Sequence, residues 1–101
     1  MKLLFVCSVN LNRSPTAERI FKDEYETKSA GIDPMARVVV TEKDIEWADI
    51  VFVMEEWQKE EIIETFPKVK RVISLDIPDQ FYYMEPELIY LLRKRVKKWL
   101  S

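Results

Sequence analysis

The sequence predicts an α/β protein with a parallel sheet that helices cover on both faces. Four short apolar runs rich in β-branched or aromatic residues recur along the chain, and helical patterns separate them. Nearly continuous apolar strands are typical of parallel sheets, because helices bury both faces of such sheets. The length of 101 residues also fits one core, which usually takes about 50–200 residues. We therefore expect a single domain over residues 1–101.

The expected elements alternate in order along the chain. The strands are expected at residues 3–6, 28–32, 50–54 and 72–77. The helices are expected at 15–25, in a short segment opened by a Thr-x-x-Asp capping pattern at 41–44, and at 55–66 and 86–100. Residues 33–40 are ambiguous, since Asp-Pro marks a turn while three valines fit a strand or a buried connection.

The last helical segment has the clearest amphipathic pattern. Its apolar side chains recur at helical spacing and predict one buried stripe. The members of this stripe are Leu88, Leu92, Val96 and Trp99. The basic run at 93–98 lies in the same segment, toward its end, where cations favour the helix dipole, so we interpret it as a solvated helix face.

The composition excludes several kinds of chemistry. The chain has no histidine, which rules out Ser-His-Asp and Cys-His catalytic pairs and histidine metal sites. Its one glycine, Gly31, is too few for a glycine-rich nucleotide loop. Any catalysis must therefore use Cys, Arg, Asp, Glu, Ser or Lys, and we expect no metal and no cofactor.

Charge and hydropathy indicate the surroundings of the protein. The net charge of −2 comes from nearly balanced signs, which gives no broad electrostatic footprint for nucleic acid. No apolar run approaches the ~20 residues of a membrane span, and the N-terminus lacks a signal-peptide pattern. The single cysteine, which has no partner for an internal disulfide, fits a reducing compartment. We expect a cytoplasmic protein that binds neither nucleic acid nor membrane.

The segment VCSVNLNRSP carries the strongest functional signal. It places Cys7 just past the end of the first strand and Arg13 six positions later. If Ser14 caps a helix that begins at Pro15, the loop lies at a helix N-terminus, where free N–H groups and the dipole bind anions. The same field favours a thiolate, and a guanidinium suits phosphoryl oxygens. The alternative is that Cys7 is a small buried hydrophobe.

The loop has to turn tightly without a glycine. Asn10 and Asn12 tolerate left-handed backbone geometry best after glycine, so we expect them to turn the chain. The hydroxyl groups of Ser8 and Ser14 are both donors within reach of a thiolate at Cys7. We favour Ser14, because it follows the arginine at the mouth of the helix.

This segment resembles the phosphate loop of the low-molecular-weight protein tyrosine phosphatases. That family's loop reads C-x-G-N-x-C-R-S-P, and here residues 7–15 read CSVNLNRSP. The resemblance continues through TAE at 16–18, KSAG at 28–31, ADIVFVM at 48–54 and DIPD at 76–79. It implies a flavodoxin-like three-layer fold with strand order 2-1-3-4, in a form shorter than the usual members.

The resemblance also implies an activity, namely hydrolysis of a phosphotyrosine-type monoester through a phosphocysteine. It makes Cys7 the nucleophile, Arg13 the clamp on the transferring group and Asp79 the general acid. The expected substrate is a phosphorylated protein or a small aryl phosphate, and inorganic phosphate or a similar oxyanion is expected in the loop. The loop residues implied to bind it are Ser8, Val9, Asn10, Leu11, Asn12 and Ser14.

Three departures from the family pattern keep alternatives open. Val9 replaces the loop glycine, and Asn12 replaces a second loop cysteine. Val9, together with the altered residues after the acid described below, leaves a non-catalytic module that binds phosphate or phosphopeptides as the main alternative function. An arsenate reductase is less favoured, because that chemistry needs further cysteines to carry electrons out as a disulfide.

The third departure affects the acid and the substrate wall. Gln80 and Phe81 replace the Pro-Tyr that follows the family's acid. Asp76, three residues before Asp79, therefore remains an alternative acid, although a carboxylate at a strand end also suits a turn. We expect Phe81, or else Tyr82, to form the aromatic wall against which a phosphotyrosine ring packs.

Overall fold

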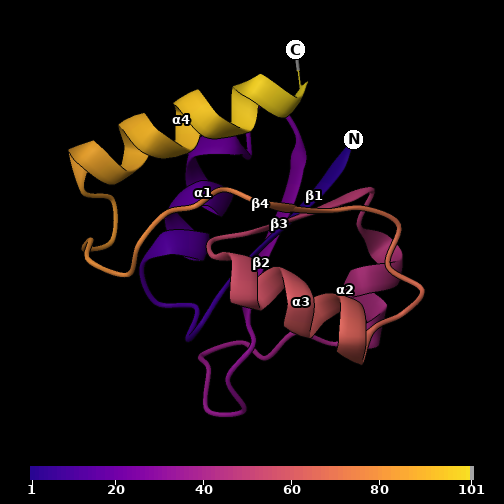
Figure 1. Cartoon of the computed structure of the whole chain (residues 1–101). Helices are drawn as coiled ribbons and strands as arrows, with labels where there is room; N and C mark the ends of the chain where they lie inside the picture. The colour runs from indigo at the N-terminus through magenta and orange to yellow at the C-terminus, as the bar shows by residue number, and fades with distance from the viewer. Residues whose placement is uncertain (101) are drawn as a thin grey trace.

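The computed structural model describes residues 1–100 and contains one four-stranded parallel sheet (Figure 1). The strand order is β2-β1-β3-β4, which confirms the order 2-1-3-4. Each of the three neighbouring pairs is parallel. The strands are β1 (Lys2–Cys7), β2 (Glu26–Gly31), β3 (Ile50–Val53) and β4 (Val72–Ser74).

Helices cover both faces of this sheet, so the three-layer α/β prediction is confirmed. In Figure 1, α1 and α4 lie on one side of the sheet, and α2 and α3 lie on the other. Among residues 1–100, no helix combines the length and the apolar character needed to cross a bilayer. The helices are α1 (Arg13–Phe21), α2 (Glu42–Trp47), α3 (Glu56–Thr65) and α4 (Pro86–Leu100).

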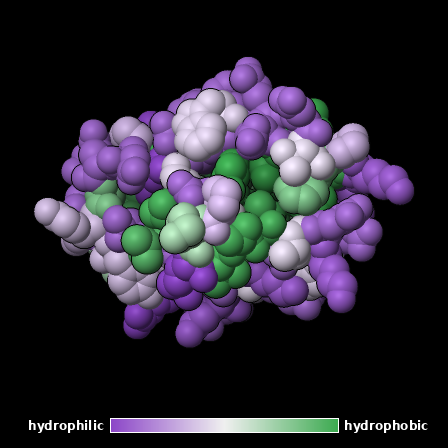
Figure 2. All heavy atoms as spheres, turned by 90° about the horizontal axis from the view of Figure 1, so that it is seen from below, coloured by the Kyte–Doolittle hydropathy of each residue, from purple (hydrophilic) through white to green (hydrophobic). Residues whose placement is uncertain are grey.

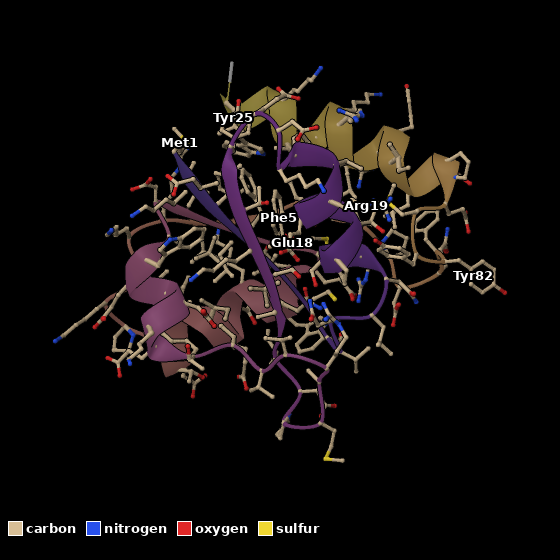
Figure 3. All side chains as sticks on the ribbon, turned by 180° about the vertical axis from the view of Figure 1, so that it is seen from behind. Met1, Phe5, Glu18, Arg19, Tyr25 and Tyr82 are labelled. Atoms are coloured by element: carbon tan, nitrogen blue, oxygen red, sulfur yellow. The ribbon has the colours of Figure 1, made fainter. Side chains whose placement is uncertain are left out.

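Alternation along β1 builds the two halves of the core. Leu3 and Phe5 belong to the apolar cluster under α1 and α4, whereas Leu4 and Val6 belong to the cluster under α2 and α3. Phe5 lies in the middle of the molecule (Figure 3). Its ring stacks on two other phenylalanine rings, with centroids 5.8 and 5.6 Å away. Strand β1 is therefore buried on both sides up to Cys7.

The stripe predicted on α4 is largely confirmed. Leu88, Leu92 and Val96 are fully buried. Trp99, the fourth member, is 42% exposed, so its prediction as a buried residue is wrong. Its ring lies at the surface beside the edge strand β4, where the guanidinium of Arg71 sits 5.9 Å from the ring centroid.

Several boundaries differ from those expected. Strand β1 includes Cys7 instead of ending before it, and β4 ends at Ser74. Asp76 has a φ of 54°, a left-handed conformation that no extended strand adopts, which explains why β4 cannot reach residue 77. Thr41 and Asp44 form the expected capping box at the start of α2.

The ambiguous residues 33–40 form a loop that lies below the sheet in Figure 1. A single bridge between Gly31 and Val39 is its one sheet-like contact among residues 1–100. Figure 2 shows the face seen from this side, with hydrophobic side chains gathered near its middle. The exposed apolar side chains of this loop are Met35, Val38 and Val39.

Candidate active site

The loop between β1 and α1, residues 8–12, turns its carbonyl groups outward onto the segment that follows β2. Backbone N–H groups of that segment donate to successive carbonyl oxygens of the loop. The pairs are Ile32 with Cys7 (3.0 Å), Asp33 with Ser8 (2.9 Å) and Arg37 with Val9 (3.1 Å). Since N–H and C=O point in opposite directions across a trans peptide, the loop's N–H groups face the other way, into its interior.

The sulfur of Cys7 lies on this inner side. The backbone N–H of Asn10 donates to Cys7 Sγ at 3.3 Å, and Ser14 Oγ lies 3.0 Å from the same atom. Within residues 1–100, the backbone N–H groups of Val9, Leu11 and Asn12 have no hydrogen-bond acceptor. The loop therefore presents unpaired donors around a sulfur, which is the arrangement that holds a tetrahedral anion.

A buried chain of hydrogen bonds leads to the sulfur. The side-chain amide of Asn10 donates to Ser14 Oγ at 2.8 Å and to Ser29 Oγ at 3.0 Å. The hydroxyl of Ser29 in turn donates to Glu18 Oε1 at 2.5 Å. Ser14 Oγ accepts from Asn10, and its single hydrogen lies within reach of two acceptors, Cys7 Sγ at 3.0 Å and the carbonyl oxygen of Ala30 at 3.3 Å. The prediction that Ser14 is the hydroxyl beside the sulfur agrees with this geometry.

Helix α1 begins earlier than expected, at Arg13, so the prediction of Ser14 as its cap is wrong. Asn12 occupies the cap position without a side-chain cap bond. Its φ of −119° also excludes the left-handed role that we expected for it. Pro15 still suits its place in the first turn, because the first four N–H groups of a helix have no internal partner. The earlier start brings Arg13 and Ser14 into the helix's first turn.

The guanidinium of Arg13 is locked beside the loop and is 1% exposed. Its Nη1 donates to Glu55 Oε2 and to the carbonyl oxygen of Ile77, both at 2.7 Å. Its Nη2 lies 3.5 Å from Ser8 Oγ. Its Nε lies 3.7 Å from Asp79 Oδ1. The side chain is therefore oriented by the N-cap residue of α3, by the segment after β4 and by the loop itself.

The two candidate acids are in different surroundings. Asp79 lies beside Arg13 and its side chain is 61% exposed, so a substrate can reach it. Asp76 forms a left-handed turn, and its carboxylate accepts a hydrogen bond from Ser74 Oγ at 3.2 Å. Its carbonyl oxygen accepts from Arg95 of α4. The geometry thus favours Asp79 over Asp76.

Phe81 does not lie where the sequence suggested. It is 5% exposed and belongs to the core cluster under α1 and α4, because the chain turns its ring inward after Asp79. A buried ring cannot form a wall for a substrate. Tyr82, the alternative, is 80% exposed and projects from the molecule at its edge (Figure 3).

Two contributors to the site were missed, namely Glu55 and Gln58. Gln58 is fully buried, and its side chain donates to Ser8 Oγ at 3.2 Å while accepting from the backbone N–H of Glu55 at 3.0 Å. A Glu-x-x-Gln capping box at the start of α3 was the available signal. Arg37, which the sequence allows to steer an anionic substrate but more readily places in solvent, donates through Nε to Asn10 O at 3.0 Å.

A scan against protein-family models finds no match, and a search of curated proteins finds none either. Many solved structures do match. YwlE arginine phosphatase from Geobacillus stearothermophilus is 25% identical, with a TM-score of 0.78 over 98% of this chain and 92% of that one. The tyrosine phosphatase Wzb from Escherichia coli K30, in complex with phosphate, is 20% identical, with a TM-score of 0.80 over 97% and 94%.

A low-molecular-weight protein tyrosine phosphatase from T. tengcongensis is 22% identical, with a TM-score of 0.71 over 97% of this chain and 99% of that one. The chain has the fold of the low-molecular-weight tyrosine phosphatases. The resemblance first seen in residues 7–15 is thereby confirmed at the level of the whole structure.

Proposed function

We propose that this protein is a phosphomonoesterase that hydrolyses aryl phosphates of the phosphotyrosine type through a phosphocysteine intermediate. The observation that carries the proposal is the loop of residues 8–12, with its carbonyl groups outward and Cys7 Sγ inside. The buried guanidinium of Arg13 next to this loop supplies the positive charge that a phosphoryl group needs. The three similar structures described above are all named as phosphatases.

In the first step, the Cys7 thiolate attacks phosphorus and the bond from phosphorus to the aryl oxygen breaks. The unpaired N–H groups of the loop and the fork of Arg13 stabilise the charge on the three equatorial oxygens. Asp79 gives its proton to the departing phenolate oxygen, because a tyrosyl leaving group with a pKa near 10 is expelled poorly without one. A solved cysteine-to-serine mutant of YwlE carries a phosphorylated active-site serine, which supports a covalent step for this fold.

In the second step, water attacks the phosphorus of the phosphocysteine while the Asp79 carboxylate takes a proton from it. The sulfur leaves as a thiolate, inorganic phosphate is released and the acid is regenerated. Ser14, 3.0 Å from the sulfur, stabilises the thiolate at the start and end of the cycle. Tyr82 is the aromatic side chain exposed near the acid, and we assign to it the wall that Phe81 cannot form.

Phosphoarginine is the second candidate substrate. Among the neighbours named above, the one with the highest identity, YwlE, is described as an arginine phosphatase. The carboxylates of Glu55 and Asp79, both beside Arg13, would attract a cationic guanidinium leaving group. Comparing a phosphotyrosine peptide with a phosphoarginine peptide of the same sequence decides between the two substrates.

The direct experiment is steady-state hydrolysis of p-nitrophenyl phosphate by the wild type and by Cys7→Ser and Arg13→Lys. We expect turnover by the wild type and no turnover by Cys7→Ser. Arg13→Lys keeps the charge but not the fork, so its turnover should fall strongly. Arg93→Lys, on the exposed part of α4, is the matched control and should behave as the wild type.

Full activity in Cys7→Ser would refute the proposal. Binding of phosphate or vanadate without turnover by the wild type would instead favour the non-catalytic binding module. Arsenate-dependent oxidation of an added thiol would favour the reductase alternative.

A further inference from the structure

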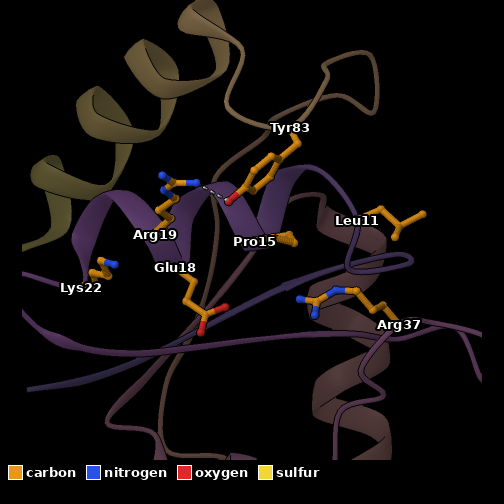
Figure 4. Close-up of a pocket in the computed structure, with 7 residues that line it drawn as sticks. All are labelled: Leu11, Pro15, Glu18, Arg19, Lys22, Arg37 and Tyr83. Atoms are coloured by element: carbon orange, nitrogen blue, oxygen red, sulfur yellow. Dashed lines mark hydrogen bonds between the residues drawn. The ribbon is translucent and has the colours of Figure 1, made fainter.

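A groove of about 440 Å³ lies beside the phosphate loop, on the outer side of α1 (Figure 4). Pro15 and Arg19 line it from α1 and Lys22 from the C-cap of that helix, and Arg37 reaches it from the loop after β2. Figure 4 shows the ring of Tyr83 on its upper side, with the hydroxyl pointing at Arg19. The groove plays no part in the mechanism derived above.

The groove carries an excess of positive charge. Three cations line it, Arg19, Lys22 and Arg37, and within residues 1–100 none of them has a carboxylate within 4.0 Å. The only acidic side chain of the lining, Glu18, already accepts a hydrogen bond from Ser29. A protein with a net charge of −2 thus collects unpaired cations next to its phosphate loop.

Two of these cations are held in place. Tyr83 accepts a hydrogen bond from Arg19 Nη1 at 3.2 Å, and this hydrogen bond raises the pKa of Arg19 above its usual value. Arg37 donates to the carbonyl oxygen of Asn10 at 3.0 Å, so its guanidinium stands at the rim of the phosphate loop. Leu11, at the tip of that loop, also lines the groove. Groove and loop are therefore continuous.

We propose that this groove binds acidic side chains that flank the phosphorylated residue of a peptide substrate. The inference rests on the proposed function, which puts the phosphoryl group in the loop. An extended peptide advances by about 3.3–3.6 Å per residue, so carboxylates within a few positions of the phosphorylated residue reach the rim at Leu11 and Arg37. Peptides with acidic side chains near the phosphorylated residue should therefore be preferred over peptides without them, because complementary charges favour particular partners across protein interfaces.

A second cavity, on the opposite side of the loop, supports the same preference for acidic side chains in the substrate. Glu55, Glu56 and Asp76 line it together with Trp57. Acidic side chains on a substrate would be repelled from this cavity and drawn toward Arg19 and Lys22. Basic side chains on a substrate would instead be drawn to this cavity and repelled by Arg19 and Lys22. A peptide with basic flanks is therefore the informative comparison.

The test uses three phosphotyrosine peptides of equal length with acidic, neutral or basic flanks, and p-nitrophenyl phosphate as a substrate without flanks. The wild type should have a kcat/KM about threefold to tenfold higher for the acidic than for the neutral peptide, as expected for two or three exposed ion pairs. The preference should shrink between about 0.05 M and about 0.5 M salt. Arg19→Gln combined with Lys22→Gln should abolish it and leave p-nitrophenyl phosphate turnover unchanged.

A second double variant, Lys43→Gln with Lys68→Gln, removes two exposed cations away from the groove and should keep the preference. The affinities of the same peptides for Cys7→Ser, measured by fluorescence anisotropy, test the groove independently of turnover. Equal affinities, no binding, or a preference for the basic peptide overturns the inference even if p-nitrophenyl phosphate is hydrolysed. Failure of the wild type to hydrolyse p-nitrophenyl phosphate overturns the proposed function instead.

Discussion

Asn10 explains how the phosphate loop manages without a glycine. Its φ of 58° makes it the one left-handed residue of the loop. An asparagine adopts this conformation more readily than most residues, and here its side chain also donates to Ser14 and Ser29. Val9 stands where the family pattern has glycine, yet its φ is not positive, so its β-branched side chain imposes no left-handed strain.

At this scale the acid assignment yields a prediction. Asp79→Asn removes the proton donor but keeps the shape, so hydrolysis of phenyl phosphate should slow by about 100- to 10,000-fold. The slowing should be much smaller for p-nitrophenyl phosphate, whose phenolate leaves without a proton. The measurement is kcat for both substrates.

Asp76→Asn is the matched control, since Asp76 is an aspartate of the same segment that forms a turn. A leaving-group dependence that appears in Asp76→Asn and not in Asp79→Asn would show that the acid is misassigned.

Glu55 yields a second prediction. Arg13 is almost fully buried and Glu55 is its carboxylate partner at 2.7 Å. Glu55→Ala removes a carboxylate that accepts a hydrogen bond from the buried guanidinium of Arg13. The free energy of unfolding should therefore fall by about 1–3 kcal/mol. Each kcal/mol lowers the Tm of a domain this small by about 4–8 °C. Thermal unfolding measures the change.

Glu56→Ala removes the exposed neighbouring glutamate and should shift the Tm little. Equal Tm values for Glu55→Ala and Glu56→Ala would mean that the ion pair with Arg13 contributes nothing to stability.

The sequence predicted the residues that act within one loop and missed those that act across the chain. Cys7 and Arg13 are six positions apart, and a local pattern identifies them. Arg13 and Glu55 are 42 positions apart, and Ser8 and Gln58 are 50 apart. Contacts at such separations depend on the register of β1 and β3, which hydrophobic pattern alone does not specify.

At the scale of elements, the segment after β2 packs against the phosphate loop and fixes its backbone through hydrogen bonds. Ile32, Asp33 and Arg37 satisfy the loop's carbonyl groups, which fixes the direction of its N–H groups. Gly31 makes this contact possible. A Cβ at Gly31 would lie 2.8 Å from Ser8 O and 2.6 Å from Ala36 Cβ, which no side chain tolerates without movement.

Gly31→Ala should therefore disturb both stability and activity. Crowding of this kind costs about 1–3 kcal/mol, and the displaced loop should hydrolyse aryl phosphates more slowly. Gly31→Ala combined with Ala36→Gly removes one of the two close contacts and should recover part of the loss. The measurements are urea unfolding and kcat/KM. An unchanged midpoint and unchanged activity in Gly31→Ala would contradict this close packing.

Element types were predictable, and element ends were not. Apolar runs and helical spacing identified most of the elements, because burial on one or two faces imposes those periods. The short helix α2 was identified by its capping pattern. The start of α1 was misjudged since Ser-Pro is a strong local signal for a cap, whereas the backbone of Asn12 already begins the helix. The end of β4 was predicted too late, because the apolar pattern of residues 72–77 continues through the left-handed turn at Asp76.

For the whole molecule, two features place the site. The parallel sheet puts the ends of β1, β3 and β4 at one edge, with β3 between the other two. The segment after β4 runs along the end of β3, where the N–H of Ile77 donates to Met54 O, and so reaches the first turn of α1. Arg13 contacts Ile77 and lies beside Asp79 for this reason. Ligands of such sheets bind at this edge, where the strand order reverses. The alternation of elements predicted the parallel sheet, and the resemblance to the phosphatase family predicted its strand order.

The central claim is that Cys7 itself carries the phosphoryl group during turnover. Acid quenching of the protein milliseconds after mixing with an aryl phosphate, followed by mass spectrometry of the peptide that contains Cys7, tests it most directly. The account predicts one phosphoryl group on the sulfur of the wild type, formed and lost at the rate of turnover. Any phosphoryl group on the serine of Cys7→Ser should stay there without turnover. Turnover that proceeds with the sulfur unmodified at every quench time, or at full rate in Cys7→Ser, would contradict it.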